Sequence, residues 1–319
     1  MAGITSSRGA HDMKNVLVTG AAGFLGRYIV REFADAETTV MGVDVIDPEA
    51  VALGDGVLYE QIALPSDEFD RVVAEFVPQI CIHCAGRASV ALSMQDPLTD
   101  FGDSVGLTFQ TLDTLRRLAP ACRFVFLSSA AVYGNPPSLP VLESHPIAPL
   151  SPYGYHKRQC ELLVEEFAKV FGLRALAVRI FSAYGFGLRR QVVWDICDRA
   201  LRNGHLRLRG TGTESRDFVH ARDVAKAISL LARNAPAEGE VYNVATGQES
   251  TIDEVARELL LSLGMNIQPE FDGVRPPGDP ANWRADISRL TAFGFEPSVP
   301  LEVGLAEVAQ WCVSTHLVQ

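Results

Sequence analysis

Residues 15–26 read NVLVTGAAGFLG, an apolar run that turns through Gly20, Gly23 and Gly26 into the helix-forming segment RYIVREFA. Glycines at these positions let backbone N–H groups approach a pyrophosphate at the positive N-terminus of a helix. Asp44 ends the next apolar run, 18 residues after Gly26, where a carboxylate meets the ribose hydroxyls of a dinucleotide. The order strand, glycine loop, helix, strand and acid predicts a dinucleotide-binding unit.

The residues after Asp44 indicate which dinucleotide is bound. No arginine or lysine occurs between Asp44 and Arg71, and Asp47 adds a second negative charge. A 2′-phosphate would therefore meet only carboxylates, so NAD is favoured over NADP. The alternative is a packed strand-to-helix turn that holds no ligand, with Asp44 as a local cap.

Short apolar runs alternate with amphipathic stretches of helix length from residue 15 to residue 179, which predicts a parallel sheet with crossover helices. The predicted fold class is α/β, a doubly wound Rossmann sheet with a smaller C-terminal α/β substrate domain. We expect an N-terminal extension over 1–12, an NAD-binding domain over 13–180 joined by about 218–248, and a substrate-binding domain over 181–217 and 249–319. The predicted strands are NVLVTG, TTVMGVD, VLYEQI, QICIHCAG, RFVFLSS and LRALAVR.

Composition excludes several classes of protein. The chain has 319 residues and a net charge of −11, so its surface as a whole should repel nucleic acid and anionic membranes. No segment reads as a signal peptide or a membrane span, and six scattered cysteines fit a reducing compartment, so we expect a cytoplasmic protein. Cysteine and histidine spacing predicts no metal site.

A serine, a tyrosine and a lysine follow the predicted strands at positions suited to proton transfer. Ser129 ends the run RFVFLSS, and Tyr153 and Lys157 are four residues apart at the start of a predicted helix, so they share one face. A tyrosine with a pKa near 10 is a poor base at neutral pH, and lowering that pKa by ~3 units takes ~4 kcal/mol. One cation about 4 Å away supplies roughly that energy at an effective dielectric near 20. Alternatively, YxxxK alone is common on exposed helices.

The motifs TGAAGFLG, HCAG, SSAAVYG, SPYGYHK, RDFVH and RADIS occur in this order along nearly the whole chain. In this pattern the chain resembles the extended short-chain dehydrogenase/reductase family, in the group of NAD-dependent epimerases and dehydratases that includes UDP-glucose 4-epimerase. The resemblance implies that Ser129, Tyr153 and Lys157 are catalytic, that the three glycines hold the pyrophosphate, and that Asp44 holds the adenosine ribose. It also implies a homodimer paired through helices near Asp96–Leu118 and Tyr155–Phe171.

Nine arginines between residues 174 and 216, with only three acids, suggest an anionic substrate. A solvated basic face is the alternative reading. The expected cofactor contacts are Gly20, Gly23, Phe24, Leu25, Gly26, Asp44, Gln61, Ile62, Cys84, Ala85, Gly86, Ser104, Tyr153 and Lys157. The expected substrate contacts are Arg87, Ser182, Arg189, Arg190, Arg216 and Arg275. Asp217 and Asp223 are expected to buttress a loop and to cap a helix at Val224.

Three reactions compete within the resembled family. Dehydration needs an acid after the catalytic serine, where this chain has Ala130 and Ala131. Ketoreduction of a nucleotide-4-keto-6-deoxy-sugar usually takes NADPH, which Asp44 disfavours, although Ser182 stands where the epimerases usually have asparagine. NAD-dependent 4-epimerisation of a nucleotide-diphosphate sugar, of the UDP-glucose/galactose type or an N-acetyl form, is therefore the hypothesis. A noncatalytic NAD-binding regulator is a further alternative, but it would not need Tyr153 and Lys157.

Overall fold

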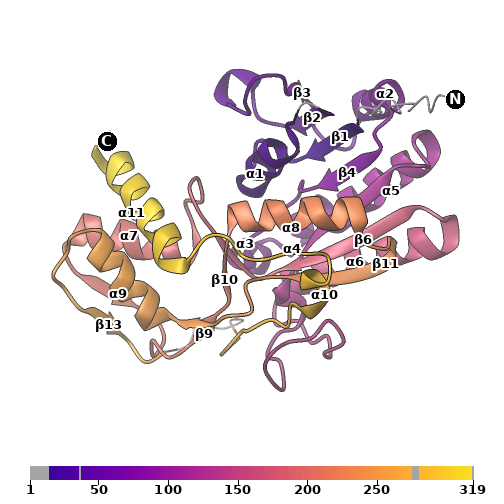
Figure 1. Cartoon of the computed structure of the whole chain (residues 1–319). Helices are drawn as coiled ribbons and strands as arrows, with labels where there is room; N and C mark the ends of the chain where they lie inside the picture. The colour runs from indigo at the N-terminus through magenta and orange to yellow at the C-terminus, as the bar shows by residue number, and fades with distance from the viewer. Residues whose placement is uncertain (1–13, 36, 275–279, 318–319) are drawn as a thin grey trace, which may run out of the picture.

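A seven-stranded parallel sheet forms the centre of the computed structural model, which describes residues 14–35, 37–274 and 280–317. The expected extension over 1–12 and Arg275 lie outside the described residues. The strand order is β11-β6-β5-β4-β1-β2-β3 (Figure 1). The strands are β1 (Lys14–Thr19), β2 (Thr38–Asp44), β3 (Leu58–Gln61), β4 (Ile80–His83), β5 (Arg123–Ser129), β6 (Arg174–Ile180) and β11 (Glu238–Val244).

The central strands are apolar on both faces because helices cover both sides of the sheet. In β1, Val16 and Val18 enter one core and Leu17 enters the other. The chain runs outward from β1 to β3 and then crosses to β4 on the other side of β1. The carboxyl ends of β1 and β4 therefore flank the crevice where such sheets bind ligands. The predicted α/β Rossmann class is confirmed.

Helices form a layer on each face of the sheet. One layer contains α1 (Phe24–Phe33) and α8 (Ala221–Asn234), which pack together. The other contains α2 (Asp67–Phe76), α5 (Leu107–Leu118) and α6 (Pro152–Phe171). Every helix of the described residues is too short or too polar to cross a bilayer.

The segment between β4 and α5 is more broken than the sequence indicated. The expected helix over Asp96–Leu118 is divided into α4 (Pro97–Phe101), a π-helical turn η2 (Gly102–Gly106) and α5. A short helix α3 (Val90–Gln95) precedes it, and the side chains of Ser89 and Asp96 cap α3 and α4. Three other short helices are η1 (Pro48–Ala50), η3 (Ala130–Val132) and α10 (Ser288–Thr291).

A smaller unit with its own core lies beyond the carboxyl ends of the strands (Figure 1). Its helices are α7 (Gln191–Asn203), α9 (Ile252–Ser262) and α11 (Leu301–Leu317), joined by the strand pair β8 (Leu206–Leu208) and β13 (Pro269–Phe271). Two further pairs connect this unit to the sheet: β7 (Ser182–Tyr184) with β10 (Phe218–His220), and β9 (Ser215–Arg216) with β12 (Ser250–Thr251).

Candidate active site

The glycine loop between β1 and α1 is shaped for close approach of backbone to backbone. Gly20 has a φ of +68°, and a Cβ there would lie 2.6 Å from the amide nitrogen of Ala85. A Cβ on Gly26 would collide with the carbonyl oxygen of Gly20. Gly23 is the N-cap of α1, and no side chain caps this helix. The free N–H groups of α1 therefore face a cradle without side chains, which fits a pyrophosphate.

Asp44 lies beside this loop at the end of β2. Its carboxylate accepts hydrogen bonds from the backbone N–H groups of Ala22 at 2.9 Å and Val45 at 2.7 Å. On the neighbouring strand, the side chain of Gln61 donates to the carbonyl of Val45 at 3.1 Å, and the N–H of Ile62 donates to that of Asp44 at 2.8 Å. The acid is thus fixed at the loop where an adenosine ribose would lie.

The chain after β4 closes the other side of the glycine loop. Gly86 has a φ of +127°, and a Cβ there would lie 2.9 Å from the carbonyl oxygen of Asp103. Ser104 is buried beneath it in the π-helical turn. Beneath the loop, the Nδ1 atom of His83 lies 2.8 Å from the Thr19 hydroxyl. Burial, helped by the charge of Lys157, lowers the pKa of His83 to about 3, so this histidine is neutral.

Strand β5 and helix α6 bring the predicted catalytic residues to one wall. Ser129 ends β5, and its hydroxyl accepts from the N–H of Ala131 at 3.2 Å. Tyr153 is in the first turn of α6. The buried ammonium of Lys157 donates to the Leu127 carbonyl at 2.8 Å and lies 5.8 Å from the centroid of the Tyr153 ring. A Cβ on Gly154 would lie 2.7 Å from the Ala131 carbonyl oxygen, so only glycine lets α6 approach this closely.

A buried ion pair fastens α6 to the sheet one turn beyond Lys157. Glu161 accepts two hydrogen bonds from Arg179 on β6, both at 2.8 Å, and one from the Ser128 hydroxyl at 2.7 Å. Arg179 also donates to the hydroxyl of Tyr133 at 2.9 Å. The geometry of the pair is bidentate, and Arg158 adds a further hydrogen bond to Glu161 at 3.1 Å, so the buried carboxylate is well compensated. This network therefore joins α6 to β5, through Ser128, and to β6, through Arg179.

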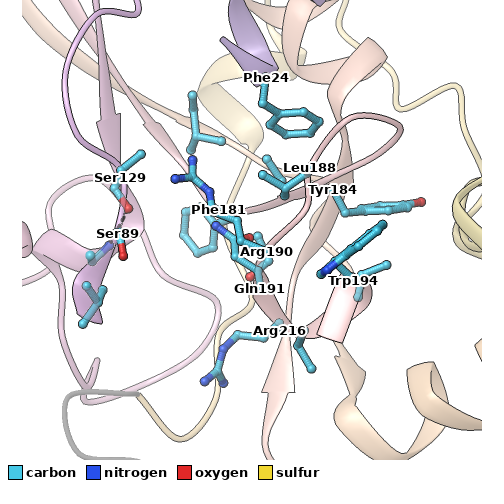
Figure 2. A pocket seen from close by; sticks show the side chains of 18 of the residues that line it. Phe24, Ser89, Ser129, Phe181, Tyr184, Leu188, Arg190, Gln191, Trp194 and Arg216 are labelled. Carbon is cyan, nitrogen blue, oxygen red and sulfur yellow. Dashed lines mark hydrogen bonds between the residues drawn. The ribbon is translucent and has the colours of Figure 1, made fainter. Parts of the chain in front are cut away.

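The predicted substrate residues that the structure describes lie across the cleft. The guanidinium of Arg189 lies about 6 Å from the ring centroids of Trp194 and Trp311. Arg216 lies 5.5 Å from the ring centroid of Trp283 and donates to the Ser215 carbonyl at 2.8 Å. In Figure 2, Arg190 and Arg216 lie between Ser129 on one side of the view and Trp194 on the other. Arg87 instead pairs with Asp103 at 2.8 Å.

One cleft of about 800 Å³ joins these parts. Of the predicted site residues, those lining it are Gly20, Gly23, Phe24, Leu25, Gly26, Cys84, Gly86, Arg87, Ser129, Tyr153, Lys157, Ser182, Arg189, Arg190 and Arg216. The other five predicted cofactor contacts are not among the residues that line it: Asp44, Gln61, Ile62, Ala85 and Ser104.

The prediction that Asp223 caps the helix at Val224 is wrong. The cap of α8 is His220, whose Nδ1 accepts from the N–H of Arg222 at 3.2 Å. Asp223 is in the first turn and accepts from the N–H groups of Ser298 and Val299, both at 3.0 Å. Strand β10 runs directly into α8, so the last strand residue has the extended conformation that a cap needs.

Several aromatic and polar wall residues were not foreseen from the sequence. Phe181, Trp194 and Trp283 line the cleft, as do Ser89 and Asp195. Each comes from a loop or from the exposed-looking side of a helix, where no local pattern marks a wall residue.

Known proteins resemble this chain over most of its length, in both sequence and structure. The model of the NAD-dependent epimerase/dehydratase family matches residues 16–245. A putative UDP-glucose 4-epimerase of Methanocaldococcus jannaschii is 30% identical over 312 residues, covering 93% of this chain and 97% of that protein. A UDP-glucose 4-epimerase of Thermotoga maritima, solved with UDP-glucose, has a TM-score of 0.86 at 28% identity, covering 95% and 99% of the chains. The Thermus thermophilus enzyme, solved with NAD, has a TM-score of 0.84 at 28% identity, covering 94% and 99%.

A Rossmann sheet with an open glycine cradle and a tyrosine and lysine on its cleft wall defines a dinucleotide-dependent enzyme of the short-chain dehydrogenase/reductase type. The chain belongs to the NAD-dependent epimerase/dehydratase family. The predicted family, the epimerase class of enzyme and the NAD cofactor are confirmed.

Proposed function

We propose that this chain interconverts the 4-epimers of a nucleotide-diphosphate sugar, either UDP-glucose and UDP-galactose or their N-acetyl forms. The observation that carries the proposal is that one cleft contains the glycine loop, the residues Ser129, Tyr153 and Lys157, and an arginine-bearing wall. The names of the relatives and of the solved neighbours support the same substrate class.

The cofactor residues fit NAD. The N–H groups of the glycine loop would hold its pyrophosphate, Asp44 its adenosine ribose, and Tyr153 and Lys157 the side that carries the nicotinamide. When bound, NAD supplies a hydride acceptor that returns the same hydride, so the reaction has no net oxidation. The remaining cofactor contacts are proposed as Phe24, Leu25, Gln61, Ile62, Cys84, Ala85, Gly86 and Ser104.

Proton transfer is assigned to Tyr153. As a phenolate, it takes the proton of the sugar 4-hydroxyl, and it later returns this proton to the 4-oxygen when the hydroxyl is restored. Ser129 donates a hydrogen bond to the 4-oxygen and keeps it near Tyr153. The ammonium of Lys157, 5.8 Å from the Tyr153 ring, stabilises the phenolate.

The residues next to Ser129 favour epimerisation over dehydration. Ala130 and Ala131 follow it, so the cleft wall has no carboxylic acid at these two positions to protonate a leaving hydroxyl. A cleft of about 800 Å³ also leaves room for a keto sugar to turn over. Arg189, Arg190 and Arg216 are proposed to bind the diphosphate, with Arg87 and Ser182 nearer the sugar. Arg275, outside the described residues, remains a proposed substrate contact.

The proposed assembly is a homodimer. Large apolar side chains are exposed on the face formed by α4, α5 and α6: Leu98, Phe101, Phe109, Leu162, Val170 and Phe171. Such a continuous apolar face fits a second copy of the chain. Light scattering coupled to size exclusion should give about twice the mass of 34.7 kDa. We also place the protein in the cytoplasm, because its six cysteines are free thiols.

The test of the function is an equilibrium assay with purified protein and NAD. UDP-glucose and UDP-galactose, or their N-acetyl forms, should interconvert with no net NADH formed. Tyr153→Phe should remove turnover and leave NAD binding intact. Steady NADH consumption on a nucleotide-4-keto-6-deoxy-sugar, without epimerisation, would replace the epimerase with a reductase.

A further inference from the structure

Among the described residues, two carboxylates line the cleft, Asp195 and Glu214, and they differ in the hydrogen bonds that they accept. Glu214 accepts hydrogen bonds from the backbone N–H groups of Thr211 at 3.1 Å and Gly212 at 3.0 Å. Its carboxylate oxygens therefore stabilise the loop that contains these two residues. Asp195 accepts no hydrogen bond and forms no ion pair within the described part of the chain. An acceptor on a binding wall that the protein leaves without a donor is available to a ligand.

Helix α7 directs Asp195 into the cleft. The opposite side of this helix, with Val193, Ile196 and Cys197, is buried in the core of the smaller unit. Asp195 and Arg199, four residues apart, both line the cleft. Burial raises the pKa of Asp195 more than the charge of Arg199 lowers it, so the carboxylate is partly withdrawn from water. A hydrogen bond from a ligand N–H or O–H group to this carboxylate would therefore be strong.

The position of Asp195 on α7 determines which part of a bound nucleotide sugar lies next to it. Ser129 ends β5 of the sheet, whereas Asp195 is on α7 of the smaller unit, in the chain that directly follows Arg189 and Arg190. With the sugar at Ser129 and the diphosphate at the arginines, Asp195 lies on the nucleoside side. A carboxylate repels phosphate, so its donor is an N–H or O–H group of the nucleoside.

We propose that Asp195 reads the nucleobase by accepting the N3–H of uracil, while Arg199 and Arg209 donate to the two flanking carbonyl oxygens. This proposal rests on the nucleotide-sugar function above. The edge of uracil presents acceptor, donor and acceptor in a row, and one carboxylate with two guanidinium groups can supply the complement. Arg209 lines the same cleft as Arg199. Cytosine has a lone pair at N3, which the carboxylate repels, so the site distinguishes UDP from CDP.

Calorimetric titration of the NAD-loaded enzyme with UDP and with CDP tests this assignment. The wild type should bind UDP about 10- to 100-fold more tightly than CDP, the value of one hydrogen bond to a charged group. In Asp195→Asn the amide can donate to the N3 of cytosine. The affinity for UDP should therefore fall by a similar factor, the affinity for CDP should rise, and the ratio of the two affinities should come near one. UDP methylated at N3 should bind the wild type as weakly as CDP does.

Asp198→Asn is the matched control, because it makes the same charge change on the same helix. Asp198 is paired with Arg202 at 2.9 Å and with His316 at 3.1 Å, and its substitution should leave the UDP to CDP ratio unchanged. The inference is overturned if Asp195→Asn, with an unchanged melting temperature, weakens UDP and CDP equally, which would assign the carboxylate to the ribose. It is also overturned if the wild type binds both equally well. Failure of the wild type to bind either nucleotide would instead remove the proposed function.

Discussion

Replacement of Lys157 by methionine isolates the electrostatic contribution of the buried ammonium to the reaction. Methionine keeps most of the length of the side chain and its apolar contact with Phe126, whose ring centroid lies 4.7 Å from the nitrogen. It removes the positive charge that faces Tyr153 and the hydrogen bond to the Leu127 carbonyl. The substitution therefore changes charge with little change in volume.

The distance to Tyr153 sets the size of the expected effect. A unit charge 5.8 Å from the ring stabilises a phenolate by about 3 kcal/mol at an effective dielectric of 20. Loss of this energy from the proton-transfer step reduces the turnover number about 100-fold, since 1.4 kcal/mol corresponds to a factor of ten. Lys157→Arg, which keeps the charge, should retain more activity than Lys157→Met.

The assay is epimerisation at saturating substrate, with NAD binding measured separately by quenching of tryptophan fluorescence. Separate measurement is needed because Lys157 is also a proposed cofactor contact. Lys169→Met is the control, since Lys169 is an exposed lysine of the same helix that pairs with Glu165. If Lys157→Met, saturated with NAD, keeps its turnover within about fivefold of the wild type, the ammonium does not stabilise the phenolate as reasoned here.

Three further predictions follow from the same structure. Gly26→Ala should weaken NAD binding about 5- to 150-fold, because its Cβ collides with the Gly20 carbonyl and overpacking costs about 1–3 kcal/mol; equal affinity in a fluorescence titration would contradict the cradle. Glu161→Ala leaves Arg179 buried without its partner and should lower the free energy of unfolding in urea by about 3–5 kcal/mol, whereas a loss below 1 kcal/mol would mean that the pair is not structural. Burial lowers the pKa of His83 to about 3, so the unfolded chain binds more protons below about pH 6.5 and stability falls as the pH drops. Between pH 6.5 and 4.5, His83→Asn should therefore lose about 2 kcal/mol less stability than the wild type, and identical losses would show that His83 titrates normally.

Features set by local backbone chemistry could be predicted from the sequence. The central strands of the sheet are buried on both faces and therefore read as continuous apolar runs, and the glycine loop is dictated by contacts that exclude a Cβ. Tyr153 and Lys157 share a helical face by spacing alone. The patterns themselves span only a few residues, so the sequence displays them even where the contact behind them is distant, as between Gly20 and Ala85.

Features set by tertiary contact could not be predicted in the same way. The break of the helix at Gly102–Gly106 is a π-helical turn beneath Gly86, and no local pattern announces it. Asp223 has the residue type and position of a cap, but the loop at Ser298 takes its carboxylate. The wall residues Trp194 and Asp195 belong to a helix whose exposed side becomes a binding surface only when the smaller unit packs beyond the sheet.

The contact between Gly154 and the Ala131 carbonyl has a consequence for how this enzyme could diversify. It holds the start of α6 tightly against the turn after β5. The distance between the Ser129 hydroxyl and the Tyr153 phenol is therefore fixed by the packing of these two elements. Variation in substrate must then accumulate on the facing wall, on α7 and its loops, where side chains can be exchanged without disturbing the chemistry. New specificities should therefore arise there, while the reaction itself stays the same.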